Sequence, residues 1–545
     1  MARVVGIDLG TTSSVVAALT CTDKRYEKPF VIPNAEGSRT TPSVVAFTPN
    51  GETLIGDAAR RQAVVNVQGT VSSVKQHMGT DRTFACGGRT YGASRISALI
   101  LGKLKRDAEA YLGEEVTGAV ITVPAHFSHA ARLATREAGE LAGLRVLRII
   151  NEPTAAALFD GIDRDDQTVL VVHCGGGTFD ISLVEVGDGV IEVKASGGDA
   201  RLGGDDWDME TARHLAARFR SLHGVDPAAD PTSLRRLCEA AEKAKVELSS
   251  ATEATIEVPC VAASAQGQLH LHDRLTRHEF QQVTRPLLDR CAAPLAQVFV
   301  DAGIAVSEVS RVVMTGGSTR MPAMISLLRD HFGDHAPAMV TQSSESVAYG
   351  AALQAGVLTG VVHDILLLDA TARSLGIAIR GGSMNRLIER NTTIPTKRSE
   401  LFTLPRDLDA ATVQIPILQG ESETAADNEQ LGVLRLTDLT RPANGGAVDI
   451  EVMFEIDGNA LLRASATDSA TGTTWSMDAD GVCAVERTQV RRKPAGSPVR
   501  KQQPAPAQQP AYEQQMSGAP RPFVLSLLAA LVALGLLGGV VWALW

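Results

Sequence analysis

The sequence predicts an α/β region, then an all-β domain, and finally a single C-terminal transmembrane helix. Residues 1–362 mix strand patterns with helix patterns, whereas residues 370–486 contain short strands with alternating hydrophobic positions. Residues 523–545 carry no charge and are almost entirely apolar. The 545 residues are enough for about three or four folded units, so we expect a multidomain chain.

The composition is that of a globular protein with an aliphatic core. Hydrophobic residues make up 44%, charged residues 21% and aromatic residues 4%, which excludes wholesale disorder and a polytopic membrane protein. The net charge of -10 argues against nucleic acid as a partner. The seven cysteines are widely spaced and form no C-x-x-C pair, so we expect neither a disulfide framework nor a zinc site. A reducing compartment fits best.

Two segments of the α/β region share a strand–glycine turn–strand pattern. They are residues 4–19, VVGIDLGTTSSVVAAL, and residues 169–186, VLVVHCGGGTFDISLVEV. Backbone N–H groups and threonine hydroxyls of such turns can converge on one anion, and each segment holds an acid, Asp8 or Asp180, able to bind Mg²⁺ through water. A single glycine-rich hairpin is more often only a tight turn, but the pair predicts a phosphate clamp. No P-loop or Rossmann fingerprint occurs.

Two helices are predicted around this clamp. Residues 128–142 begin at a capping serine and end at Gly143. On the helix near residues 234–249, Glu242, Lys245 and Ser249 fall at i, i+3 and i+7 and share one polar face, which without context is more often only solvated.

A third glycine-containing element follows later in the α/β region. It is residues 312–322, VVMTGGSTRMP. Gly316 and Gly317 let a flat ligand approach the backbone, and Arg320 can stack on that ligand.

The segment between the two folded regions allows two interpretations. Residues 363–369, HDILLLD, place four aliphatic residues between acids, which fits either a buried strand or a hydrophobic latch between domains.

In the all-β domain, apolar and other residues alternate strictly over residues 448–456, and Asp457-Gly458 provides a turn into residues 461–466. Several such strands predict a β-sandwich.

The C-terminal region predicts a membrane anchor. Residues 487–522 are basic and rich in Pro and Gln, which predicts a disordered linker, and the 23 residues 523–545 could span the roughly 30 Å hydrocarbon layer as a helix. A buried soluble helix is the alternative. No cleavable signal peptide is expected at the N-terminus. The basic residues that precede this segment are expected on the cytoplasmic side of the membrane. We therefore expect a tail anchor in the lipid of a bacterial inner membrane, with the rest of the chain in the cytoplasm.

Taken in order, the motifs resemble the ATPase domain of the 70-kDa heat-shock chaperone family. They are GIDLGTTSS, AVITVPAHFSHAARLATREAGELAG, IINEPTAAAL, GGGTFDIS, LGGDDWD, VVMTGGSTRMP and VAYGAALQAG. NTTIPTKRS, ILQGE and AADN resemble the family's β-sandwich peptide-binding domain, so the resemblance covers residues 1–486. It implies an actin-like, two-lobed ATPase with ATP or ADP and Mg²⁺ between the lobes. The implied partners are unfolded polypeptides, a J-domain co-chaperone and a nucleotide-exchange factor.

The resemblance also assigns residues to roles. The implied catalytic residues are Lys75, Glu152, Asp180 and Asp8, the last two on the Mg²⁺ side. The implied nucleotide contacts are Gly10, Thr11, Thr12, Gly175, Gly176, Gly177, Thr178, Gly203, Gly204, Glu242, Lys245, Ser249, Gly316, Gly317, Ser318 and Arg320. Coupling between domains is implied for Pro124, Arg132, Leu366 and Leu367, and peptide-groove positions for Arg380, Pro405 and Thr412.

The sequence departs from the family pattern at several of these places. His173 stands where the family has an aspartate. A neutral imidazole cannot supply the negative charge of that aspartate, and a protonated imidazole would repel Mg²⁺. We therefore expect ATP hydrolysis to be weakened more than ATP binding. The alternative is that the remaining acids suffice. Ala200 replaces a threonine, and Ser343-Ser344 replaces Pro-Asp. The groove positions are more polar than the family's, so peptide preference is in doubt. The family's helical lid is missing, so nothing would cover a bound peptide.

Three functions follow from these observations. The first is a tail-anchored, lidless chaperone ATPase with weak hydrolysis that binds unfolded or membrane-proximal polypeptides. The second is an ATP-binding, membrane-tethered scaffold with little hydrolysis that recruits one partner; His173 favours it, whereas Lys75 and Glu152 favour the first. A sugar kinase of the same broad fold is a distant third, because it would lack the latch and the sandwich.

Overall fold

The computed structural model describes residues 3–22, 25–161, 166–264, 267–404, 412–437, 439, 447–477 and 483–487. The chain divides into two compact units, residues 1–490 and 491–545. The predicted transmembrane helix and nearly all of the predicted linker before it lie outside the described residues. Within those residues, no helix is long and apolar enough to cross a bilayer.

The first sheet of the α/β region contains the first predicted hairpin. Its strand order is β11-β10-β1-β2-β3, with β4 paired to β2. The bounds are β1 Arg3–Asp8, β2 Ser13–Thr22, β3 Arg25–Val31, β4 Thr41–Pro42, β10 Val116–Val123 and β11 Arg145–Asn151. Strands β1 and β2 are antiparallel, whereas β10 is parallel to both β1 and β11. The predicted strand–turn–strand over residues 4–19 is therefore confirmed.

The second sheet contains the second hairpin and reaches into the segment after the α/β region. Its order is β18-β17-β12-β13-β14-β19-β22. The bounds are β12 Gln167–Cys174, β13 Phe179–Gly187, β14 Val190–Asp199, β17 Arg311–Thr315, β18 Ala338–Thr341, β19 Leu366–Ala370 and β22 Thr393–Ile394. The hairpin of β12 and β13 confirms the strand–turn–strand predicted over residues 169–186.

Helices pack on both sheets. Their bounds are α1 Asp57–Gln62, α2 Ala93–Leu112, α3 His129–Leu141, α4 Glu152–Gly161, α5 Gly204–His223, α6 Pro231–Leu248, α7 Arg277–Val283, α8 Arg285–Ala302, α9 Pro322–Phe332 and α10 Ser346–Leu358. The hydroxyl of Ser128 accepts the Ala131 N–H at the start of α3, which confirms the predicted capping serine. The helix predicted near residues 234–249 is α6.

One apolar cluster joins the two sheets. It contains side chains of β2 and β12 together with buried alanines of α4 and α10. A Cβ atom at Gly350 of α10 would collide with the Ala155 carbonyl of α4, and one at Gly6 of β1 would collide with the backbone of α10. These glycines therefore let backbones pack directly on one another, which fixes the two halves around a shared core.

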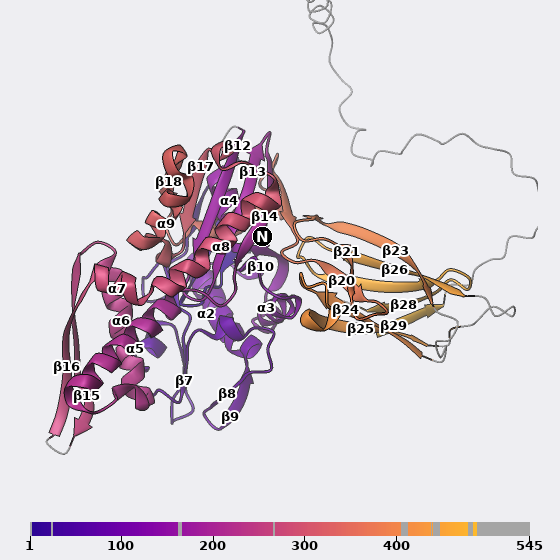
Figure 1. Ribbon diagram of the computed structural model, residues 1–545. Helices are drawn as coiled ribbons and strands as arrows, with labels where there is room; N and C mark the ends of the chain where they lie inside the picture. Colours follow the sequence, from indigo (N-terminus) through magenta and orange to yellow (C-terminus); the bar gives the residue numbers. More distant parts are fainter. Residues whose placement is uncertain are drawn as a thin grey trace, which may run out of the picture. The chain divides into compact units, whose positions relative to one another are not determined.

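Short strands extend the α/β region at its periphery. One three-stranded sheet and two hairpins form from β5 Val45–Phe47, β6 Thr53–Ile55, β7 Thr70–Val71, β8 Thr83–Cys86, β9 Arg89–Gly92, β15 Glu253–Ser264 and β16 Gly267–Thr276. Figure 1 shows β15 and β16 as a long two-stranded ribbon beside α5 and α6.

After β19 the described chain is built of strands and short turns, as expected. One sheet has the order β21-β20-β24-β25, and the other has the order β23-β26-β27-β28-β29 (Figure 1). The bounds are β20 Leu375–Ala378, β21 Met384–Ile388, β23 Thr396–Leu404, β24 Thr412–Gln419, β25 Glu429–Thr437, β26 Val448–Ile456, β27 Leu462–Asp468, β28 Thr473–Met477 and β29 Cys483–Arg487. The inward side chains of the two sheets share one core around Phe454 and Trp475.

The segment predicted as a strand or a latch forms strand β19. Leu366, Leu367 and Leu368 run parallel to β14 and extend the edge of the second sheet. Leu367 is buried at 6% exposure, whereas Leu366 is 53% exposed, as alternation along a strand requires. The segment is thus a strand, and the sheet that it joins belongs to the α/β region.

Candidate functional site

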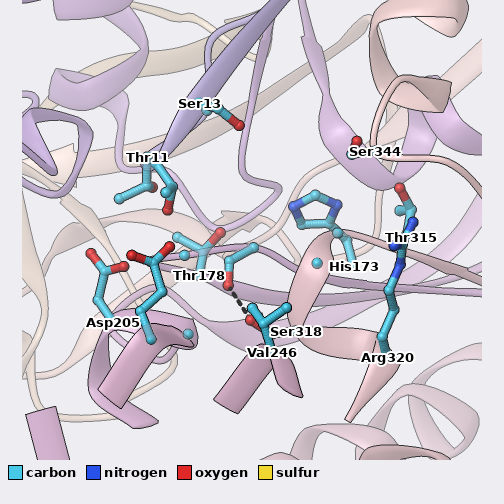
Figure 2. A pocket seen from close by; sticks show the side chains of 18 of the residues that line it. Thr11, Ser13, His173, Thr178, Asp205, Val246, Thr315, Ser318, Arg320 and Ser344 are labelled. Atoms are coloured by element: carbon cyan, nitrogen blue, oxygen red, sulfur yellow. Dashed lines mark hydrogen bonds between the residues drawn. The ribbon is translucent and has the colours of Figure 1, made fainter. Parts of the chain in front are cut away.

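A cavity of about 580 Å³ lies between the turns of the two hairpins. Most of the residues predicted to contact a nucleotide line it. They are Asp8, Gly10, Thr11, Thr12, Lys75, Glu152, Gly175, Gly176, Thr178, Gly204, Glu242, Lys245, Ser249, Gly316, Gly317, Ser318 and Arg320. Figure 2 shows Thr11 and Asp205 on one side of the cavity, and Arg320 and Ser344 on the other.

Three predicted residues do not line the cavity. A Cβ atom at Gly203 would collide with the backbone of Gly176, and one at Gly177 would crowd Gln76 and Thr11, so both glycines serve the close packing of the loops. Asp180 is fully buried. Its Oδ1 accepts the His126 backbone N–H at 3.3 Å, and its Oδ2 has no hydrogen-bond partner among the described residues.

The two hairpin turns approach each other closely at one end of the cavity. A Cβ atom at Gly176 would overlap the Thr12 hydroxyl, so glycine lets the second turn lie against the first without displacing the Thr12 side chain. Glycine and threonine residues of both turns line the same space, namely Gly10, Thr11, Thr12, Gly175, Gly176 and Thr178. This end is built to bind an anion such as a phosphate chain.

Beside this end, Glu152 lies between two basic side chains. Lys75, on the 3₁₀ turn Val74–His77, contacts Oε1 of Glu152, and Nε2 of His173 lies 2.9 Å from Oε2. Glu152 is the first residue of α4, and His173 is near the end of β12. All three side chains are less than 10% exposed, so water screens these pairs little.

The electrostatics of this cluster favour charge on Glu152 and on His173. Burial alone would raise the pKa of Glu152, but Lys75 and His173 offset it and hold that pKa below its ordinary value. Burial opposes charge on His173, yet the Glu152 carboxylate raises the pKa of the imidazole. Burial, followed by the nearby Glu152 charge, raises the pKa of Asp8 to about 6. Of the two forms considered for His173, the structure therefore favours the protonated one.

The other end of the cavity is formed by α6 and by the loops around Arg320 and Ser344. Lys245 donates to the Gly204 carbonyl at 2.9 Å and to Oδ2 of Asp208 at 2.7 Å. Arg60 of α1 lies 3.5 Å from Glu242 of α6, so an ion pair connects the two halves of the α/β region. The predicted polar face of α6 thus faces the cavity rather than only solvent.

Several residues of the cavity wall had no role predicted from the sequence. Asp205 and Asp208 line it, and burial raises the pKa of Asp208 to about 7. Val246, Ser250 and Thr315 line it as well. The two aspartates fall in the quoted motif LGGDDWD, which is the signal that could have identified them.

The predicted coupling residue Arg132 belongs to a chain of buried hydrogen bonds that reaches β19. Arg132 donates to the Ala125 carbonyl at 2.9 Å, next to Pro124, and to Oδ1 of Asn151 at 2.6 Å. Asn151 in turn donates to both carboxylate oxygens of Asp369 in β19 at 2.9 Å. Because Asn151 directly precedes Glu152, the cavity and β19 are joined through one short segment.

The predicted peptide groove is described only in part. Arg380 follows β20 and its side chain is exposed. Pro405 and the side chain of Thr412 lie outside the described residues. The domain boundaries and the groove therefore stay predictions.

The described residues form an α/β region of two large sheets with a cavity that can accept an anion, followed by an all-β region of two sheets around one core. A model of the Hsp70 protein family matches residues 4–86 and 82–515. The chain therefore belongs to the Hsp70 family. Members of this family are ATPases that bind ATP or ADP with Mg²⁺, and they bind unfolded polypeptides together with J-domain and nucleotide-exchange co-chaperones.

Within the described ranges, no group of three or more His, Cys, Asp or Glu residues could hold a metal ion by itself. Asp180, however, keeps a buried carboxylate oxygen without a partner there, and Asp8 lines the cavity. Two separated carboxylates suit Mg²⁺, which retains several of its water ligands and binds phosphate oxygens. The residues present therefore fit a nucleotide-bound Mg²⁺.

Proposed function

We propose that this protein is a membrane-anchored, lidless Hsp70-like chaperone that binds ATP tightly and hydrolyses it slowly. The observation that supports this proposal most is that the segment Asn151-Glu152 contacts both the cavity and β19. Glu152 lines the cavity and contacts Lys75, while Asn151 bonds Asp369 of the strand that precedes the β-sandwich. Through this segment, a nucleotide bound in the cavity can change how stably β19 pairs with β14.

In this proposal the chain's own residues position the nucleotide. The two glycine turns hold the phosphates, Lys75 stabilises charge on the transferring phosphoryl group, and Glu152 accepts a hydrogen bond from the attacking water. Asp8 and Asp180 would hold Mg²⁺ through water. When bound, Mg²⁺ neutralises charge on the phosphate oxygens.

Slow hydrolysis follows from His173. A protonated imidazole 2.9 Å from Glu152 competes for the carboxylate that the water requires, and it places a positive charge beside the metal position. Nucleotide binding depends less on His173, because the two glycine turns and α6 supply the contacts that bind the nucleotide. His173 also supports the second candidate, an ATP-binding scaffold with almost no turnover that recruits one partner.

The membrane anchor and the missing lid complete the proposal. The apolar residues 523–545 would tether the β-sandwich beside a bacterial inner membrane, where unfolded or membrane-proximal segments would be its substrates. Retention of a peptide without a lid would rest on high local concentration at the membrane surface.

Replacing Leu367 with aspartate should abolish ATP-dependent release of bound peptide while ATP still binds. Leu367 is buried against the second sheet, so an unpaired charge there disfavours the attachment of β19 to β14. The measurement is the dissociation rate of a fluorescent unfolded peptide with and without ATP. Leu222→Asp is the control, because Leu222 is 78% exposed on α5 and should retain the response. Normal ATP-dependent release from Leu367→Asp would contradict the coupling role of β19.

A further inference from the structure

The turn that carries Lys75 begins at a residue in an unusual conformation. Ser73 directly precedes the 3₁₀ turn Val74–His77 and has φ 51° and ψ 30°, a left-handed conformation that residues other than glycine rarely adopt. A serine before a helical turn commonly caps that turn with its hydroxyl, but the Ser73 side chain forms no such cap. The hydroxyl of Ser73 is therefore available for a contact outside the turn.

That contact lies in the other half of the α/β region. The Ser73 hydroxyl donates to Oδ2 of Asp205 at 2.6 Å, although the two residues are 132 positions apart in the sequence. This distance is typical of a hydroxyl that donates to a carboxylate, which is a stronger bond than one between neutral groups. Asp205 lies in the first turn of α5, and its backbone N–H donates to the Gly176 carbonyl of the second glycine turn at 2.8 Å. Asp205 thus connects the second glycine turn to the turn of Lys75.

The turn of Lys75 is held at both of its ends. Lys75 lies two residues after Ser73, and its ammonium group contacts Glu152. Within the turn, the Gln76 N–H donates to the Ser73 carbonyl at 3.2 Å, and the Met78 N–H donates to the Lys75 carbonyl at 3.2 Å. Because the turn is short and internally bonded, a displacement of Ser73 would move Lys75 with it.

The side of the turn that bears this hydrogen bond borders a cavity. Ser73 and Asp205 line a second cavity of about 570 Å³, which adjoins the first because Thr11 and Thr12 line both. A turn that borders a cavity makes fewer van der Waals contacts on that side than a turn in a packed core. The position of the turn on this side therefore depends largely on the hydrogen bond.

We infer that Ser73 and Asp205 are positioning residues for phosphoryl transfer, because their hydrogen bond holds Lys75 at the phosphate end of the cavity. The inference rests on the proposed function, since it takes Lys75 to act on the transferring phosphoryl group. Binding of ATP should depend little on this bond, because the two glycine turns and α6 supply the contacts. Loss of the bond should instead weaken the interactions that strengthen during transfer, when a small displacement of a cation costs most.

The first test is equilibrium binding to the full chain in detergent, with Ser73→Gly as the variant. Glycine adopts the left-handed conformation without strain, so the substitution removes the hydroxyl and spares the backbone. The probes are ATP with Mg²⁺, and ADP with Mg²⁺ and aluminium fluoride, which mimics the phosphoryl group in transfer. The variant should bind ATP within about threefold of the wild type, and ADP with aluminium fluoride about tenfold or more weakly. Equal changes for both probes would overturn the inference.

Variants of Asp205 show whether the effect arises from the hydrogen bond. Asp205→Ala should give the same difference between the probes. The double variant with Ser73→Gly should lose no more than the larger single loss, since both substitutions remove one bond, and additive losses would contradict the inference. Asp205→Asn keeps an oxygen that accepts the Ser73 hydroxyl proton, so it should lose less than Asp205→Ala; equal losses would also contradict it.

A control and the behaviour of the wild type separate this inference from the proposed function. Glu210→Ala removes a carboxylate of α5 that pairs with the exposed Arg213, and it should change neither affinity. A wild type that binds both probes as expected, with Ser73 and Asp205 variants that match it, would overturn this inference alone. A wild type that does not bind ATP, or does not bind ADP more tightly when aluminium fluoride is present, would overturn the proposed function.

Discussion

Replacement of Lys75 with alanine is expected to reduce ATP turnover by about a hundredfold or more while leaving ATP affinity within about fivefold of the wild type. Lys75 reaches the cavity from the turn Val74–His77, and its ammonium group contacts Glu152. A cation there acts mainly on charge that develops as the phosphoryl group transfers, whereas many backbone groups share the binding of the ground state. Single-turnover hydrolysis and equilibrium binding, measured on the same preparation, separate the two effects.

Two controls make the Lys75 result interpretable. Lys105→Ala removes a lysine of α2 that pairs with Glu109 away from the cavity, so it should change neither quantity. Because Lys75 is buried, the variant must also be shown to fold; stabilisation against heat by ATP provides that evidence. Equal losses of binding and turnover would show that Lys75 serves binding rather than the phosphoryl transfer step.

Truncation before Phe523 is expected to move the protein from the membrane pellet to the supernatant. Full-length protein should withstand an alkaline carbonate wash, because the 23 residues 523–545 contain no charge and can bury their apolar side chains in lipid. The basic residues of the preceding linker contribute only a salt-sensitive attraction of about 1 kcal/mol each to anionic lipid. The fraction of protein in pellet and supernatant is the readout.

The matched control neutralises Arg500 and Lys501 of the linker in the full chain. That variant should stay in the pellet after the wash, since the apolar segment is intact. Release of the full-length protein by carbonate, or retention of the truncated one, would contradict the membrane anchor.

Local patterns in the sequence were sufficient to predict the elements of the site. The hairpins of β1–β2 and β12–β13 follow from apolar runs interrupted by glycine turns, and α3 follows from Ser128 and Gly143. Each of these features is contained in one short continuous segment of the chain, which is why a single sequence is enough to predict it.

The contacts that set the chemistry could not be predicted in this way. Lys75, Glu152 and His173 are far apart in the sequence, and only the packing of the two sheets around α4 and α10 brings them together. The protonation of His173 stayed open for the same reason, because its partner Glu152 was unknown. Asp208 was missed because its carboxylate matters only through burial beside Lys245.

The segment before the β-sandwich illustrates a different limit. Four consecutive aliphatic residues predict burial on two faces, yet of these four only Leu367 is buried, and Leu366 is exposed. The partner strand β14 lies more than a hundred residues earlier in the sequence, so no local signal could identify the sheet edge that β19 joins. The choice between strand and latch required the tertiary fold.

The most direct test of the account is the single-turnover rate of ATP hydrolysis by the wild type and by His173→Asp, at saturating ATP and Mg²⁺. The substitution removes the cation that occupies Glu152 and adds a carboxylate on the metal side, so the rate should rise by about tenfold or more. His335→Asp, at an exposed histidine outside the cavity wall, is the control and should leave the rate unchanged. An unchanged rate in His173→Asp would contradict the claim that His173 slows this ATPase.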